Sequence, residues 1–83
     1  MISAAQMRAA RALLGIDQKQ LAALSGVSLP TIQRMEASTG TMRGNIDTLT
    51  RVVEAIETAG VELINNEQPS RGLGRGVRLK DRA

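Results

Sequence analysis

The sequence predicts a small, mainly α-helical domain in which four short helices precede a C-terminal β-hairpin. The chain has 83 residues and no Phe, Tyr or Trp, so its core must be aliphatic, which suits helix packing. Up to Gly60, apolar residues recur at helical spacing between capping residues. Beyond Gly60 the pattern changes to two short strand-like runs, separated by a segment rich in Gly, Asn, Pro and Ser.

The composition argues against several kinds of site. The chain has no Cys, which excludes disulfides, thiolate zinc sites and thiol nucleophiles. It also has no His, the commonest general base, which excludes a Ser-His-Asp triad. We therefore expect no enzymatic activity, no metal and no cofactor. The absence of Cys is compatible with a reducing, cytoplasmic location.

The charge is modest in total but segregated along the chain. The formal net charge is +3, and nine of the 11 cations are Arg, a residue suited to bidentate contacts with phosphates and guanine edges. Residues 1–45 carry +3, residues 46–67 carry −4 and residues 68–83 carry +4. No apolar run approaches the ~18 residues of a membrane span, and the N-terminus lacks a signal-peptide pattern. We therefore expect a soluble protein without a membrane partner.

The first two helices are predicted from a repeated capping pattern. Ser3 is a typical N-cap, and Gln6, three residues later, completes a capping box. Gly15 ends this first helix. Asp17 and Gln20 repeat the same pattern, so a second helix begins two residues after the first one ends.

The third helix follows a turn at Gly26. Pro30 suits a first helical turn but disfavours helical angles at the residue before it, so either Ser28 or Leu29 is the N-cap. The helix is expected to end near Ala37.

Residues 38–45 have turn composition and are predicted to form a loop. A fourth helix follows and ends at Gly60, and the hairpin strands are expected at 61–64 and 77–80. The apolar residues at helical spacing that predict this helix are Ile46, Leu49, Val53 and Ile56, with Val52 beside them.

Residues 18–37 hold the most informative pattern. Ala22 is small enough for one helix to cross another, and Gly26 tolerates the positive φ that a tight turn requires. This combination suits a helix-turn-helix, although other α-hairpins also use Gly at a bend. The apolar residues spaced to share a core are Leu21, Val27, Ile32 and Met35.

Over these residues the sequence resembles the Cro and phage-repressor type of helix-turn-helix regulator, often called the XRE family. The resemblance is carried by the runs from Arg11 to Ala22 and from Gly26 to Glu36, and it covers roughly residues 3–60. The family fold is a bundle of about five short helices. This sequence predicts four helices and a hairpin, so the fifth helix is missing or replaced.

The resemblance implies a sequence-specific transcriptional regulator that binds double-stranded DNA. We expect this regulator to act as a repressor that binds a two-fold symmetric operator as a homodimer, because one module has a small reading surface and the strand-like tail could pair across a two-fold axis. The third helix would lie in the major groove, and Gln18 would bind a phosphate, as suits a helix N-terminus. The residues expected on or beside the DNA-facing side of the third helix are Ser28, Leu29, Pro30, Thr31, Gln33 and Arg34.

Among these residues, Arg34 is the strongest candidate for a guanine contact, and Leu29 and Pro30 suit thymine methyl groups. Arg43 matches the loop position where the family grips the DNA backbone. The family also pairs an Arg of the first helix with a Glu ending the third, which assigns an architectural ion pair to Arg11 and Glu36. The competing interpretation for Arg34, Gln33 and Arg43 is ordinary solvated surface.

We expect a DNA-binding domain over residues 1–60 and a hairpin with a basic tail over residues 61–83, which would serve dimerisation. The tail cations either touch DNA or only add solubility. An alternative function is the antitoxin of a toxin-antitoxin pair, with the tail wrapped around a partner protein. The residues expected at the dimer surface are Val61, Leu63, Val77 and Leu79.

Overall fold

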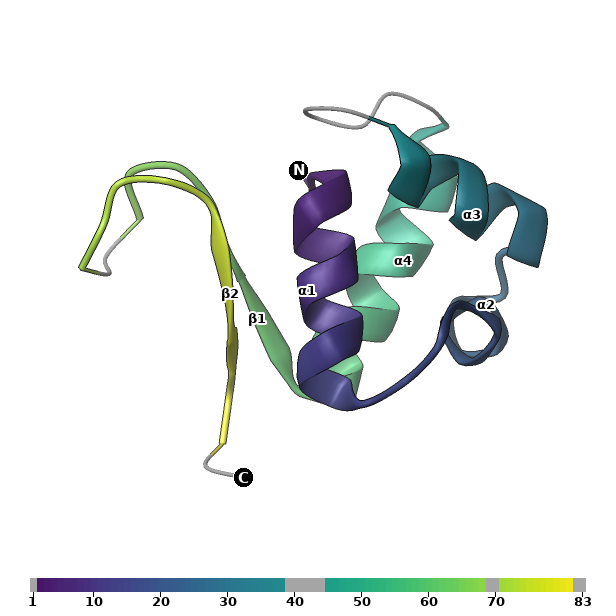
Figure 1. The fold of residues 1–83 in the computed structure, drawn as a ribbon, viewed down its shortest axis with the longest axis horizontal. Helices are drawn as coiled ribbons and strands as arrows, with labels where there is room; N and C mark the ends of the chain where they lie inside the picture. Colours follow the sequence, from purple (N-terminus) through teal and green to yellow (C-terminus); the bar gives the residue numbers. More distant parts are fainter. Residues whose placement is uncertain (1, 39–44, 69–70, 82–83) are drawn as a thin grey trace.

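The computed structural model describes residues 2–38, 45–68 and 71–81. Within these ranges it contains four helices and a two-stranded antiparallel sheet (Figure 1), which confirms the predicted fold class. The elements are α1 (Ala4–Leu14), α2 (Gln18–Ser25), α3 (Leu29–Ala37), α4 (Ile46–Ala59), β1 (Val61–Ile64) and β2 (Gly76–Leu79).

The helix ends follow the capping residues. Ser3 Oγ accepts a hydrogen bond from Gln6 N at 3.1 Å, and Gln6 Oε1 accepts one from Ser3 N at 2.9 Å. An equivalent capping box begins α2 at Asp17. Ser28, not Leu29, is the N-cap of α3. These short-range interactions explain why the helix bounds could be predicted from local sequence.

A single core joins all six elements. Its fully buried side chains include Met7 of α1, Leu21 of α2, Ile32 of α3 and Ile56 of α4. The hairpin shares this core, since Val61 of β1 is 0% exposed. The hairpin is therefore packed against the helices as part of the same core.

Ile46 belongs to the apolar pattern that predicts α4, but its side chain is 73% exposed. The buried face of α4 is formed by Leu49, Val52 and Ile56. At ~100° per residue, Ile46 lies roughly 90° around the helix from the middle of that face. Ile46 is also the first residue of α4, so it has a neighbouring turn of this helix on its C-terminal side only.

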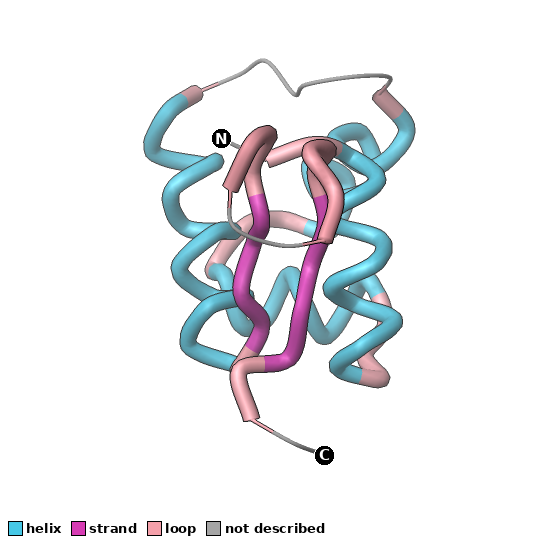
Figure 2. The backbone as a smooth tube through the Cα atoms, turned by 90° about the vertical axis from the view of Figure 1, so that its left-hand side faces the viewer, coloured by secondary structure: helices cyan, strands magenta, loops and turns pink. Residues whose placement is uncertain are grey.

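The hairpin lies against α1 and α4 (Figures 1 and 2). Its second strand, β2, begins at Gly76, one residue earlier than predicted. The register pairs Val61 with Leu79 and Leu63 with Val77. Leu63, Val77 and Leu79 are partly buried against the helices' core. The side chains expected at a dimer surface therefore face the protomer's own interior, and Val61 has no exposed area to offer a second chain.

Gln6 connects the hairpin to α1. Its side chain is buried, and Nε2 donates to the carbonyl oxygens of Ile64 at 3.0 Å and Gly76 at 3.1 Å. With the bond that Oε1 accepts from Ser3 N, one amide satisfies three backbone groups. Gln6 thus joins the start of α1 to the ends of both strands that lie nearest the hairpin turn.

Replacing Gln6 by Met should lower the free energy of unfolding by about 2–4 kcal/mol, because the Ser3 N–H and two partly buried carbonyls lose their partner. Gln20 is the matched control, since it occupies the same capping-box position of α2 but is exposed. Gln20→Met should cost less than about 1 kcal/mol, because water can replace the lost bond. Urea unfolding followed by circular dichroism measures both. Equal losses would contradict the role given to Gln6.

Candidate nucleic-acid interface

The turn between α2 and α3 is held by short backbone and side-chain bonds. Gly26 has φ 70° and donates its N–H to Ala22 O at 3.0 Å. Ser25 is buried, and its Oγ donates to Leu21 O at 2.8 Å and accepts from Val27 N at 3.3 Å. The sequence pattern alone did not predict this role of Ser25. These bonds fix how α3 leaves α2.

α3 has one anchored face and one open face. Ile32 and Glu36 are buried, while Pro30, Gln33 and Arg34 are exposed as their spacing predicts. Ser28 is also exposed, and Leu29 and Thr31 are half-buried beside them. The nine-residue helix therefore presents its polar side and its N-terminal turn to solvent.

Hydrogen bonds run along this open face. Ser28 Oγ donates to Thr31 Oγ1 at 2.9 Å, and Arg34 Nη2 donates to the same oxygen at 3.3 Å. Arg34 therefore extends along the helix toward its N-terminus, and its other guanidinium N–H groups have room to meet a ligand.

Arg11 and Glu36 join α1 to the end of α3. Arg11 Nε lies 2.7 Å from Glu36 Oε2, and Arg11 Nη2 donates to Oε1 at 2.8 Å. The Glu36 side chain is 3% exposed and that of Arg11 is 21% exposed. This bidentate geometry is the favourable one for a guanidinium and a carboxylate.

Gln18, the first residue of α2, lies at the same carboxylate. Its Nε2 donates to Glu36 Oε1 at 3.2 Å. An amide nitrogen carries two hydrogens, so the second remains for another acceptor. Glu36 thereby sets the direction of the Gln18 side chain at the N-terminus of α2, where free backbone N–H groups favour an anion.

A comparison of the sequence with models of known protein families agrees with this geometry. A model described as helix-turn-helix matches residues 7–62, which include α2, the turn and α3. The chain belongs to the XRE-type helix-turn-helix family. The resemblance found in the sequence is confirmed, and the protein is a DNA-binding transcriptional regulator of this type. The family is one of regulators and not of enzymes. A search of curated proteins found no match.

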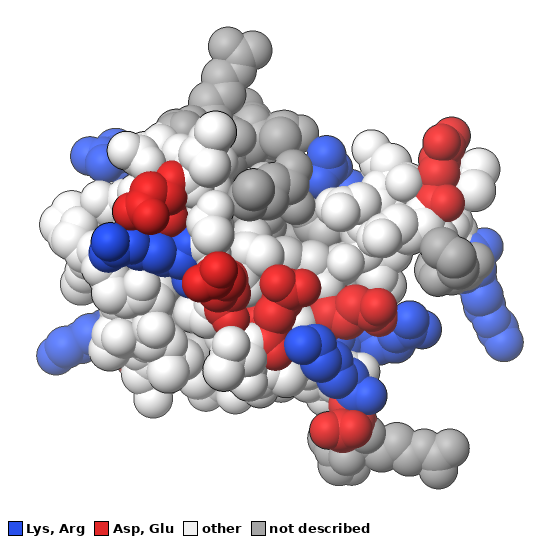
Figure 3. Space-filling model, turned by 180° about the vertical axis from the view of Figure 1, so that it is seen from behind, with Lys and Arg blue, Asp and Glu red and all other residues white. Residues whose placement is uncertain are grey.

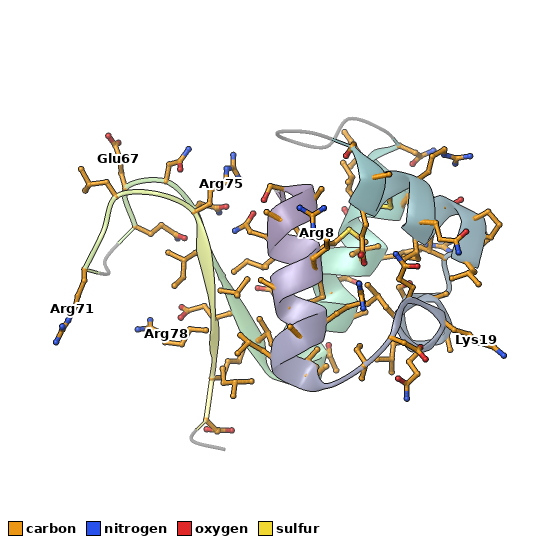
Figure 4. All side chains as sticks on the ribbon, in the orientation of Figure 1. Arg8, Lys19, Glu67, Arg71, Arg75 and Arg78 are labelled. Carbon is orange, nitrogen blue, oxygen red and sulfur yellow. The ribbon has the colours of Figure 1, made fainter. Side chains whose placement is uncertain are left out.

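A second arginine of this helix-turn-helix regulator also binds the end of α3. Arg8 Nη1 donates to the backbone oxygen of Glu36 at 2.5 Å, and Figure 4 shows Arg8 directed from α1 toward α3. The sequence analysis did not single out Arg8. The available signal was its position three residues before Arg11, which places both side chains on one face of α1.

The environment of Glu36 keeps it ionised. Burial alone would raise the pKa of Glu36, but hydrogen bonds from Arg11 and Gln18 and the charges of Arg11 and Arg8 outweigh it, so the pKa falls below its ordinary value of 4.5. The hydrogen bond to Glu36 raises the pKa of Arg11, against a smaller opposing effect of burial. Both partners stay charged at neutral pH.

Acidic side chains gather away from the open face of α3. Asp47, Glu54 and Glu57 are exposed on α4, and Glu62 follows on β1. Figure 3 shows acidic groups in a row across this side of the helix-turn-helix regulator, with Lys and Arg side chains beside them. Such segregation leaves the α2–α3 side the more favourable one for a polyanion.

Arg43, which the sequence predicts at the DNA backbone, lies outside the described residues. No group of three His, Cys, Asp or Glu side chains that could hold a metal ion occurs in the part of the chain that the structure describes. No helix in that part is both long and apolar enough to cross a membrane.

Replacing Glu36 by Gln should destabilise the regulator by about 3 kcal/mol at pH 7. This value is near the lower end of the cost of breaking a buried ion pair, because the Arg11 side chain is partly exposed. Since folding lowers the pKa of Glu36 below 4.5, its contribution is complete above that pH and falls as pH drops through the folded pKa. The difference between wild type and variant should therefore shrink in acid.

Glu62→Gln is the matched control, because Glu62 pairs with Arg78 while its side chain is 49% exposed. This change should cost less than about 1 kcal/mol. Urea unfolding at a series of pH values measures all three proteins. A wild-type advantage over the Glu36 variant that does not change down to pH 3 would contradict the assignment.

Proposed function

We propose that this regulator is a sequence-specific repressor that binds a two-fold symmetric operator as a homodimer, with α3 in the major groove. The observation that carries the proposal is the division of α3 into two faces. Ile32 and Glu36 fix one face to the protein, while Gln33 and Arg34 are exposed on the other. A helix held in this way presents its side chains to base edges without further ordering of its backbone.

Arg34 is the residue proposed to read sequence most strongly. A bidentate contact from Arg to guanine O6 and N7 is worth about 1–3 kcal/mol of discrimination. Gln33 adds an amide suited to adenine, and Leu29 and Pro30 offer apolar surface to thymine methyl groups. Ser28 and Thr31 flank these contacts at the start of the helix.

Gln18 is proposed to position the protein on the DNA backbone. Its side chain is already oriented by Glu36, and the positive end of the α2 dipole adds to the attraction for a phosphate. Arg43 remains a proposed second backbone contact, from the loop before α4. Such contacts fix register and affinity but carry no sequence information directly.

Dimerisation is proposed because one nine-residue helix reads few base pairs. The described sheet has two strands, so the outer edge of each is not paired within this chain. A second copy could add to such an edge. Because Val61, Leu63, Val77 and Leu79 face inward, this contact would use backbone groups and the outer pair Glu62 and Arg78.

The alternative function, an antitoxin that also binds its own operator, is favoured by one observation. The hairpin lies across α1 from α3 (Figure 1), so a partner protein could cover it while α3 stays on DNA. A co-transcribed gene for a small toxin, whose product co-purifies with this chain, would support the alternative.

Arg34→Ala should change base preference at one position of each half-site, because a base contact is lost. Arg43→Ala should weaken binding to all sequences alike and reduce the slope of affinity against salt. Arg78→Ala is the control, since Arg78 pairs with Glu62 on the hairpin, across α1 from α3, and should leave base preference unchanged at every position. Selection of bound duplexes followed by sequencing gives the preferences. An unaltered preference in the Arg34 variant would contradict the assignment.

Two copies should bind per operator, and inserting about five base pairs between half-sites should abolish high-affinity binding. That insertion turns one half-site by about half a helical turn relative to the other. Native mass spectrometry gives the stoichiometry, and fluorescence anisotropy gives the affinity. One copy per operator, or indifference to the insertion, would exclude a two-fold symmetric dimer.

A further inference from the structure

The turn of the hairpin carries an exposed leucine that the proposed function does not use. Leu73 is 75% exposed, the highest value among the large apolar side chains that the structure describes. Its carbonyl oxygen accepts a hydrogen bond from Glu67 N at 2.6 Å, and Glu67 has φ 64°, which is uncommon for a residue other than Gly. The backbone at Leu73 is therefore hydrogen-bonded to Glu67, while the Leu73 side chain is exposed.

A matching groove lies between α2 and α4. Its apolar lining is formed by Leu24, Ala55 and Ala59. The polar lining residues are Ser25, Arg51, Glu54 and Thr58. Leu24 is 57% exposed. Burying one leucine side chain strengthens association by about 10- to 100-fold. Covering the apolar surface of the groove and of Leu73 would therefore favour association.

The two features cannot meet within one chain. The molecule extends 34 Å along its longest axis, and Figure 1 shows the hairpin turn and α2 at opposite ends of it. The net charges are complementary: near Leu73 the two cations Arg71 and Arg75 outnumber Glu67, whereas Glu54 lines the groove and Glu57 is exposed on the same helix. Arg51 also lines the groove, but its charge is matched by Asp47 at 3.1 Å. Figure 4 shows Arg71 directed away from the rest of the molecule.

We propose that the groove between α2 and α4 binds the hairpin turn of a second copy of this chain, with Leu73 in the groove and Arg71 and Arg75 near the acidic side chains of α4. The contact joins two different surfaces, so each copy keeps one free turn or one free groove and further copies can add. It differs from the two-fold dimer proposed above, which uses the same surface twice.

A single leucine makes this contact weak between free molecules. On DNA, copies bound at adjacent sites have a high effective concentration, and the same contact then makes binding cooperative. Leu24 lies six residues after Gln18, about 9 Å along α2, so the groove stays clear of the phosphate-binding end. Only this consequence on DNA rests on the proposed function, because the contact itself needs no DNA.

Disulfide trapping tests the contact directly, because the chain has no Cys of its own. One variant carries Gly74→Cys, a position where an added Cβ meets nothing within 4 Å, and leaves Leu73 in place. A second carries Thr58→Cys in the groove. Under mild oxidation without DNA, the mixture should form the mixed disulfide at least 10-fold faster than either variant forms its own dimer. Adding Leu73→Ser to the Gly74→Cys chain should slow the reaction by about 10-fold.

The control is Ala12→Cys, an exposed position on α1 outside the groove, mixed with the Gly74→Cys chain. The mixed disulfide at Thr58 must form faster than the one at Ala12. Faster homodimers of the Gly74→Cys chain would show that hairpin turns meet each other and would overturn the proposal. Equal rates at Thr58 and Ala12, or no effect of Leu73→Ser, would overturn it as well. Circular dichroism of each variant verifies the fold.

Discussion

The carboxylate of Glu36 is the group on which the arrangement of the first three helices depends. It is a buried charge, and such a charge is tolerated only when it is paired and hydrogen-bonded. Arg11 of α1 binds both of its oxygens, and Gln18 of α2 binds one of them. Arg8 holds the backbone of the same residue. One residue at the end of α3 thus fixes the direction of the proposed reading helix and orients the proposed phosphate ligand.

The hairpin completes the other side of the core. Val61 enters the core, and Gln6 satisfies a carbonyl on each strand. The hairpin packs against α1 and α4, and it puts Arg71, Arg75 and Arg78 across α1 from α3 (Figure 4). The duplex proposed for α3 would therefore lie away from these cations, which favours solubility or a second partner over an additional DNA contact as their role.

Local interactions were predictable from the sequence, and long-range ones were not. Ser3 and Asp17 begin helices through bonds to residues three positions away, so their role can be recognised in the sequence alone. Gln6 also bonds to residues 58 and 70 positions away, and no local pattern reports such contacts. The exposure of Ile46 was not predicted, because apolar periodicity identifies one face of α4 but does not show where along the helix that face becomes buried. The Arg11–Glu36 contact was anticipated from the family resemblance alone.

The central claim is that α3 and the N-terminus of α2 meet DNA while the hairpin does not. Backbone amide NMR shifts, recorded as a selected duplex is added, test it most directly. We expect the largest changes at residues 18–19 and 28–34 and little change at Glu62 and Arg78. Largest changes on β1 and β2, with α3 unaffected, would contradict it.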